Sequence, residues 1–289
     1  MTLTSRASSR ERYSQSRPGA VPSDGPRLLL VARRAYEWLQ PLLYESMTLT
    51  FIASQPHSAS VAALQAKSPE FITTTLHRVV FNVGGGAAED ALSVLAICDG
   101  VSHLALNLHY GAKMRLRDVM QRAPSVRRLA IAGTLNEIFP TPDGQPWAAP
   151  EPCPITGFFL HLTHLHFCLS LDFVATTFLC ALPALTHLAL RDTISAERCD
   201  ILLRRCASLR VLCLLGYPGY AYRLAQSLAS QPVSRDVRLC VCMMRPGWDA
   251  VALPDKRTFW DDADDFVAKR RLRDGPVKSL LAVRLECTK

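Results

Sequence analysis

Apolar residues recur along the chain in short blocks with the pattern apolar-x-x-apolar-x-apolar. Three early blocks begin 25 residues apart, and three later blocks begin 23 and 24 residues apart; they start at Leu76, Val101, Val126, Leu162, Leu185 and Leu209. Each block has the length and alternation of a strand whose first, fourth and sixth side chains point into a core. The segments between blocks, such as residues 87–98 and 114–123, have helical spacing. The pattern therefore predicts one strand and one helix per repeat.

A strand–helix unit with a period in the twenties is typical of leucine-rich repeats. Neither element can bury its apolar face alone, so neighbouring units stack and share a continuous core. We therefore predict an α/β fold, an irregular leucine-rich-repeat-like solenoid of roughly six or seven units with parallel strands on one face and helices on the other. Such solenoids expose an extended strand face that binds other proteins.

Stacking the blocks aligns their third and fifth positions, which should point away from the helices. The third-position column is Arg78, His103, Arg128, His164, His187 and Val211, and the fifth-position column is Val80, Ala105, Ala130, His166, Ala189 and Cys213. These columns predict a row of basic and imidazole side chains beside a row of mostly small ones. We expect the contact surface for a partner protein to comprise Arg78, His103, Arg128, His164, His166 and His187.

Composition divides the rest of the chain. Residues 1–27 are rich in Ser, Arg and Pro, which predicts a disordered leader rather than a mitochondrial presequence. Pro41 should end the first helix, and an alternating stretch from Leu42 to Leu49 should contain the first strand. The expected organisation is a leader (1–27), a helical segment (28–46), a solenoid (47–273) with a Pro-rich loop (132–157) and a capping helix (258–273), and a tail (274–289).

Two further motifs resemble a known family. Val31-Ala32-Arg33-Arg34 followed by Trp38 and residues 40–46 resembles the closing half of an F-box, and Arg245–Asp249 followed by Thr258-Phe259-Trp260 resembles the end of F-box/leucine-rich-repeat-like proteins of mushroom-forming (basidiomycete) fungi. The resemblance implies a non-catalytic substrate receptor of a cullin-type ubiquitin ligase. It also implies that Val31, Arg34 and Trp38 contact a Skp-type adaptor. Upstream of residue 28 the family's Leu-Pro-x-Glu helix is not found.

Charge and cysteine usage narrow the possible partners. The net charge is +8, but the basic residues are spread along the chain, so we do not expect a nucleic-acid partner. The apolar stretch from Phe158 to Leu182 contains Asp172 and histidines, so we do not expect a membrane span. Ten cysteines include no C-x-x-C pair, which predicts neither a zinc site nor a disulfide framework and favours a cytoplasmic or nuclear location.

Candidate chemistry is sparse. His164, His166 and His187 should lie near one another, where imidazoles could hold zinc or titrate near neutral pH, but a solvated sheet face with residues suited to strands explains them without a metal. Gly84-Gly85-Gly86 lacks the rest of a phosphate-binding loop and is interpreted as a tight turn. The acidic residues at 261–265 stand in the first turns of a helix, where they complement its dipole.

Catalytic motifs such as G-x-S-x-G and H-E-x-x-H are missing from the sequence. We therefore predict a protein that is not an enzyme and needs no metal or other cofactor. Two alternatives remain open. One is a free-standing leucine-rich-repeat scaffold without ligase attachment, and the other is a metal-dependent enzyme that uses the histidine cluster.

Overall fold

The computed structural model describes residues 25–52, 58–109, 114–133, 159–168, 173–191, 194–243, 258–272 and 280. Most of the expected leader (residues 1–24), most of the Pro-rich loop 132–157, the segment Arg245–Asp249 and most of the tail lie outside the described residues, whereas the last three residues of the expected leader belong to a helix. The chain divides into two compact units, residues 1–40 and 41–289. No described helix is both long and apolar enough to cross a membrane.

The first described helix, α1 (Gly25–Tyr44), belongs mainly to the first unit and runs into the second. It passes through Pro41, so the prediction that this proline ends the helix is wrong. A proline removes one backbone donor and clashes with the preceding turn, but the turns on either side can remain helical with a local kink. The helix ends three residues after Pro41, and the first strand begins at Ser46.

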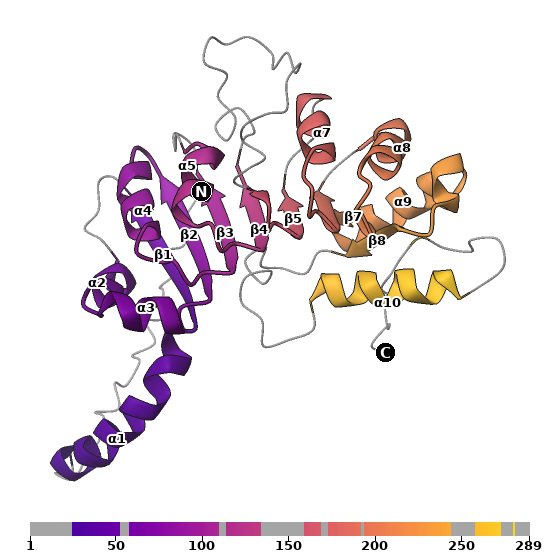
Figure 1. Cartoon of the computed structure of the whole chain (residues 1–289). Helices are drawn as coiled ribbons and strands as arrows, with labels where there is room; N and C mark the ends of the chain where they lie inside the picture. Colours follow the sequence, from indigo (N-terminus) through magenta and orange to yellow (C-terminus); the bar gives the residue numbers. More distant parts are fainter. Residues whose placement is uncertain are drawn as a thin grey trace, which may run out of the picture. The chain divides into compact units, whose positions relative to one another are not determined.

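The second unit is an α/β structure with one sheet of eight parallel strands in sequence order (Figure 1). Every neighbouring pair of strands is parallel. The strands are β1 (Ser46–Ile52), β2 (Arg78–Gly84), β3 (His103–Leu108), β4 (Arg128–Ala132), β5 (His164–Phe167), β6 (His187–Arg191), β7 (Val211–Gly216) and β8 (Leu239–Met243).

Helices connect most of these strands. They are α2 (Ala59–Gln65), α3 (Pro69–Thr75), α4 (Ala88–Leu95), α5 (Leu116–Arg122), α7 (Phe173–Cys180), α8 (Ala196–Arg205), α9 (Pro218–Ala229), the 3-10 turn η2 (Pro232–Arg235) and α10 (Phe259–Arg271). Side-chain oxygens of Ser68 and Ser195 accept a backbone N–H at the starts of α3 and α8. Thr258 and Asp261 form a reciprocal capping box at the start of α10, which agrees with the structural interpretation of this acidic segment.

The main hydrophobic core lies between the sheet and helices α2 to α9, on what we call the helix face. Fourth- and sixth-position side chains such as Leu165, Phe167, Leu188 and Leu190 are almost completely buried there. The predicted alignment of the third- and fifth-position columns is confirmed, because His164 pairs with His187 and the other members pair in the same register. The periodic blocks therefore do form neighbouring strands.

A regular backbone ladder fixes this register at the amino ends of the strands. The carbonyl of His77 accepts hydrogen bonds from the consecutive N–H groups of Ser102 and His103. The carbonyl of Ser102 does the same for Arg127 and Arg128. Further strands repeat the arrangement with donors at 163 and 164, 186 and 187, and 210 and 211. One carbonyl thus serves two donors in each repeat, which satisfies the backbone groups where each strand begins.

The opposite side of the sheet, the second face, is partly covered by α10. Trp260, Ala263 and Val267 of α10 form a second core with side chains of β6, β7 and β8, including Val211 and Cys213. Figure 1 shows α10 on the side of β7 and β8 away from α7, α8 and α9. The expectation that this helix caps the open end of the stack is therefore wrong. In the last strands of the sheet, third- and fifth-position side chains such as Val211 and Cys213 are apolar. They instead give α10 a surface on which to bury its own apolar residues.

Burial of the fifth-position column also differs from the sequence expectation. Val80, Ala105 and Ala130 form a small buried cluster, although these positions were expected to face outward into solvent. His166 and Cys213 of the same column are buried too. The column does lie on the second face, but it is not an exposed contact row.

Candidate functional site

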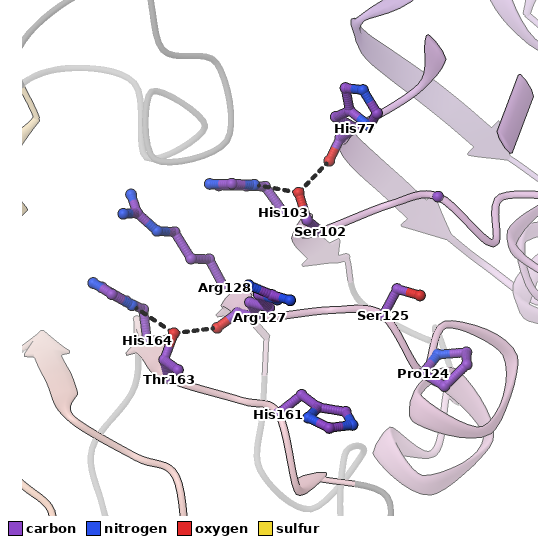
Figure 2. A pocket seen from close by; sticks show the side chains of 11 residues that line it. His77, Ser102, His103, Pro124, Ser125, Arg127, Arg128, His161, Thr163 and His164 are labelled. Carbon is purple, nitrogen blue, oxygen red and sulfur yellow. Dashed lines mark hydrogen bonds between the residues drawn. The ribbon is translucent and has the colours of Figure 1, made fainter. Parts of the chain in front are cut away.

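A pocket of about 830 Å³ lies at the amino ends of β3, β4 and β5 (Figure 2). Residues that begin these strands, and the turns that precede them, form its walls. The lining residues are His77, Gly100, Ser102, His103, Pro124, Ser125, Arg127, Arg128, His161, Thr163 and His164. A methyl group at Gly100 would lie 2.0 Å from the Thr73 carbonyl oxygen, so only glycine fits at this position of the wall.

Hydroxyl groups orient two of the imidazoles in the pocket. The Ser102 hydroxyl lies 3.3 Å from the His77 carbonyl oxygen and 2.8 Å from Nδ1 of His103. The hydroxyl donates its one hydrogen to the His77 carbonyl, so it can only accept a hydrogen bond from the His103 ring. Nδ1 of the neutral His103 ring is therefore the N–H donor, and Nε2 is left as an acceptor. Thr163 and His164 repeat the arrangement at 2.9 Å. Figure 2 shows both hydrogen-bond pairs, one on each of two strands.

The positive charge of the pocket at neutral pH belongs to arginines. Burial, followed by the charges of Arg128, Arg78 and His77, lowers the pKa of His103 to about 4. Burial, followed by His187, Arg128 and His103, lowers the pKa of His164 to about 2. Both imidazoles are therefore neutral at pH 7, while the guanidinium groups remain charged.

None of the lining residues is a carboxylate. Within the described residues, neither Arg127 nor Arg128 forms an ion pair. Arginine binds carboxylates through two parallel N–H donors, and an anion held close to His103 or His164 would favour their protonated forms. The pocket can therefore bind an anionic group, and its affinity should rise as these histidines accept protons.

Helix α10 covers the neighbouring part of the third-position column. The rings of His164 and His187 stack with centroids 4.0 Å apart, and both meet the edge or face of Trp260. Nε2 of His187 donates to the Asp264 carboxylate at 3.0 Å. His187 is consequently held beneath α10, whereas the pocket side of His164 remains accessible.

His166 is also withdrawn from the surface. Its side chain is 1 % exposed, its Nε2 lies 3.3 Å from Sγ of Cys168, and its ring meets Phe259 with centroids 5.5 Å apart. Burial, followed by the charge of Arg191, lowers its pKa to about 3. His166 and His187 were expected at a partner-contact surface, and in this structure α10 residues cover them.

The other expected contact residues lie on the open part of the second face. Arg78, His103 and Arg128 adjoin one another in register, and Arg78 forms an ion pair with Glu45 at 3.3 Å. His103 and Arg128 also line the pocket. Of the expected adaptor-contact residues, Trp38 is 78 % exposed on α1, and the side chains of Val31 and Arg34 lie outside the described residues.

The sequence interpretation missed the residue that precedes each third position. Ser102, Arg127 and Thr163 stand there, and each supplies pocket wall as well as the backbone N–H of the ladder. A Ser/Thr-His pair recurs at 102–103, 163–164 and 186–187, and this repetition was the available signal.

Metal-ligating side chains gather elsewhere than expected. Among the described residues, the group whose ligand atoms come close enough for a metal ion is Cys213, Cys240 and Cys242. His164, His166 and His187 do not form such a group, since two of the rings stack face to face and the third lies in the fifth-position column. The geometry therefore gives no support to a zinc site made of these histidines.

Comparison of the sequence with models of protein families finds no match, and comparison with curated proteins finds no similar one. Neither comparison identifies a family, so a function for the F-box-like motifs can only be proposed. The fold is the α/β arrangement with one parallel sheet described above.

Proposed function

We propose that this chain is a non-catalytic protein-interaction module, a leucine-rich-repeat-like solenoid that binds an acidic segment of a partner protein. The observation that carries the proposal is the pocket at the amino ends of β3 to β5, which combines two arginines with four histidines and has no carboxylate in its lining. The sequential parallel sheet and the repeated backbone ladder support the solenoid description.

The shape and chemistry of the pocket favour a peptide over a small substrate. His103 and Arg128 line the pocket, and Arg78 lies next to His103 in the strand register, so an extended segment bound in the pocket can continue along these three residues. Arg127 and Arg128 would bind carboxylates of the segment. Nε2 of His103 and of His164 would accept hydrogen bonds from its peptide N–H groups, or a proton at low pH. Nothing in this arrangement requires a nucleophile or a general base.

Replacing Arg127 by glutamate should weaken binding of a fluorescent Glu-rich peptide by about tenfold or more, because the substitution puts a carboxylate where the peptide needs a cation. Fluorescence anisotropy at low ionic strength measures the change. Binding by the unaltered protein should also weaken with added salt, since exposed charge pairs are screened.

Arg210 provides a matched control. It precedes β7 as Arg127 precedes β4, donates its N–H to the equivalent carbonyl of Thr186, and is exposed, but it does not line the pocket. Arg210→Glu has the same charge change and should leave most of the affinity intact. Equal losses for the two variants would show that net charge, rather than the pocket, attracts the peptide.

Attachment to a ubiquitin ligase is a second part of the proposal, and it draws on the F-box-like motif in α1. Trp38, Leu39, Leu42 and Leu43 are all more than half exposed on this helix. Exposed apolar side chains clustered on one helix commonly mark a protein contact. They would dock on a Skp-type adaptor together with Val31 and Arg34.

The purified chain should co-elute with a Skp-type adaptor in size-exclusion chromatography, and Trp38→Ala should abolish co-elution because it removes the largest exposed anchor. Tyr222→Ala, which removes an exposed aromatic ring on α9, is the control. If the unaltered chain does not co-elute at micromolar concentration, the chain is the free-standing scaffold, and the peptide-binding proposal stands separately.

A further inference from the structure

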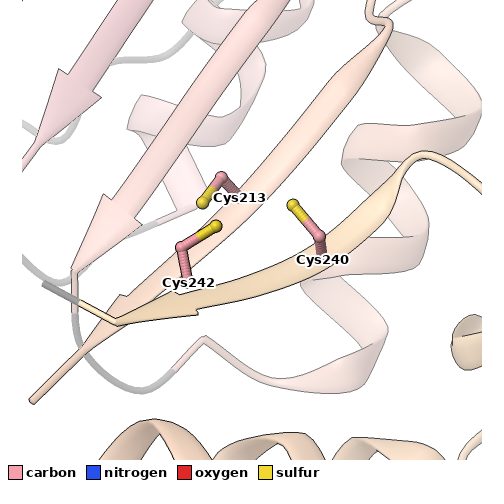
Figure 3. A group of neighbouring side chains, drawn as sticks. All are labelled: Cys213, Cys240 and Cys242. Carbon is pink, nitrogen blue, oxygen red and sulfur yellow. The ribbon is translucent and has the colours of Figure 1, made fainter. Parts of the chain in front are cut away.

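Three cysteine side chains meet beneath α10. Cys213 comes from β7, and Cys240 and Cys242 come from β8 (Figure 3). Their sulfur atoms all lie within 4.8 Å of one another, and all three side chains are buried. Cys213 and Cys240 are partners in the strand register, and Cys242 follows two residues along the same face. The group is thus built by rigid strands rather than by a loop.

The donor set is purely sulfur. Within the described part of the chain, no histidine nitrogen or carboxylate oxygen joins the group as a fourth ligand. Structural zinc sites are almost always four-coordinate, whereas soft thiolates also select Cu(I). Cu(I) has a filled d shell and is stable with three thiolates around it, so three convergent sulfurs suit it better than a hard or four-coordinate ion.

A positively charged side chain of α10 is fixed on the strand that carries Cys240 and Cys242. The guanidinium of Arg270 is held by the carbonyl oxygens of Leu239 and Ser234 at 2.7 and 2.8 Å. Three thiolates and Cu(I) carry a net negative charge, which Arg270 would offset in part.

Three buried cysteines could instead serve only as small apolar side chains in the second core. The core residues around them include Ala189, Val211 and Leu215, which would suit that role. Apolar filling does not require all three sulfur atoms to lie within 4.8 Å of one another, with the Arg270 guanidinium bound to the strand that carries two of them. We propose that Cys213, Cys240 and Cys242 bind one Cu(I) ion between the sheet and α10.

Binding forms three Cu–S bonds and releases the protons that the thiols carry, with no change in oxidation state. The reduced, full-length protein would be titrated anaerobically with Cu(I) in the presence of the chromophoric chelator bathocuproine disulfonate. We expect one equivalent of Cu(I) to be withdrawn from the chelator. X-ray absorption should show three sulfur ligands and no nitrogen.

Cys240→Ala should no longer withdraw this equivalent. Loss of a direct ligand should lower the affinity for Cu(I) by more than the roughly 10- to 100-fold that is usual when a residue hydrogen-bonded to a ligand is replaced. The control replaces Cys180 and Cys206 by alanine, since these thiols also lie close together, 3.3 Å apart, but on the helix side of the sheet. This variant should keep the site. Circular dichroism verifies folding, and Cys242→Ala takes the place of Cys240→Ala if the latter does not fold.

Any of four results would overturn the assignment. The unaltered protein could leave all Cu(I) with the chelator, Cys240→Ala could retain as much as the control, or the absorption spectrum could show nitrogen ligands. A parallel titration with Zn(II) separates the metals: tighter retention of zinc than of Cu(I), each against a chelator of known affinity, would also contradict the proposal.

Discussion

Lowering the pH from about 7 to 4 is expected to reduce the free energy of unfolding by several kcal/mol. Burial lowers the pKa of His166 to about 3, from the ordinary value of 6.5 that applies in the unfolded chain. Between these values the unfolded chain binds a proton that the folded chain excludes, so folding becomes less favourable as pH falls. At about 1.4 kcal/mol per pKa unit, His166 alone contributes a loss of about 3 kcal/mol by pH 4.

His103 and His164 act in the same direction, because their pKa values are also lowered, to about 4 and about 2. The loss should begin near pH 6.5 and continue down to the folded-state pKa values, with no contribution above pH 7. Urea denaturation at a series of pH values measures it. His166→Gln should flatten the dependence, and replacement of the exposed His161 by glutamine should not. An unfolding free energy that stays constant from pH 7 to 4 would show that His166 is not buried as described.

Replacing Trp260 by alanine is expected to lower the free energy of unfolding by about 3–5 kcal/mol, as is usual for a buried aromatic side chain. The ring is 2 % exposed and fills the second core beneath α10, where it also meets His164 and His187 at centroid distances of 5.3 and 5.7 Å. Its removal leaves a cavity between α10 and the sheet, and it weakens the attachment of the whole helix.

Denaturant titration gives the global effect, and hydrogen exchange shows whether α10 separates first. Trp38→Ala is the control with the same chemical change, and because Trp38 is 78 % exposed it should alter stability by less than about 0.5 kcal/mol. Similar effects for the two tryptophans would mean that α10 does not pack on the sheet. Faster exchange confined to α10 would show that this helix can leave the second face while the eight strands stay paired.

The sheet was predictable because its information is local and repeated. Leu165, Leu188 and Leu212 stand at the same position of successive blocks, and the structure places them on neighbouring strands in register. A slip of one residue would turn each apolar triplet away from the helices, so the apolar pattern alone sets the pairing. The third- and fifth-position columns followed from that register.

The location of α10 was not predictable from the repeat, since α10 is not part of it. The sequence does contain a hint. The third-position column changes from Arg78 and His103 at one end to Val211 at the other. An apolar residue at a position expected to be exposed indicates that something covers it. The order of strands along the sheet tells which end is covered, but only the three-dimensional structure shows that the cover is α10.

The pocket and the cysteine group escaped sequence analysis for a related reason. Arg127 lies one position before the third-position column, and the other residues that line the pocket come from several repeats. Cys213 is far in sequence from Cys240 and Cys242, so a search for closely spaced ligand motifs does not detect the group. Both sites depend on strand stacking, which brings equivalent positions of different repeats together.

The most direct test of the proposed interaction site is the imidazole NMR spectrum of the protein during titration with a Glu-rich peptide. A carboxylate bound in the pocket should raise the pH at which the ring signals of His103 and His164 move to their protonated positions, because a nearby negative charge favours the imidazolium. His109, an exposed histidine at the opposite end of β3, should not change. Peptide binding that leaves His103 and His164 unchanged would contradict the account.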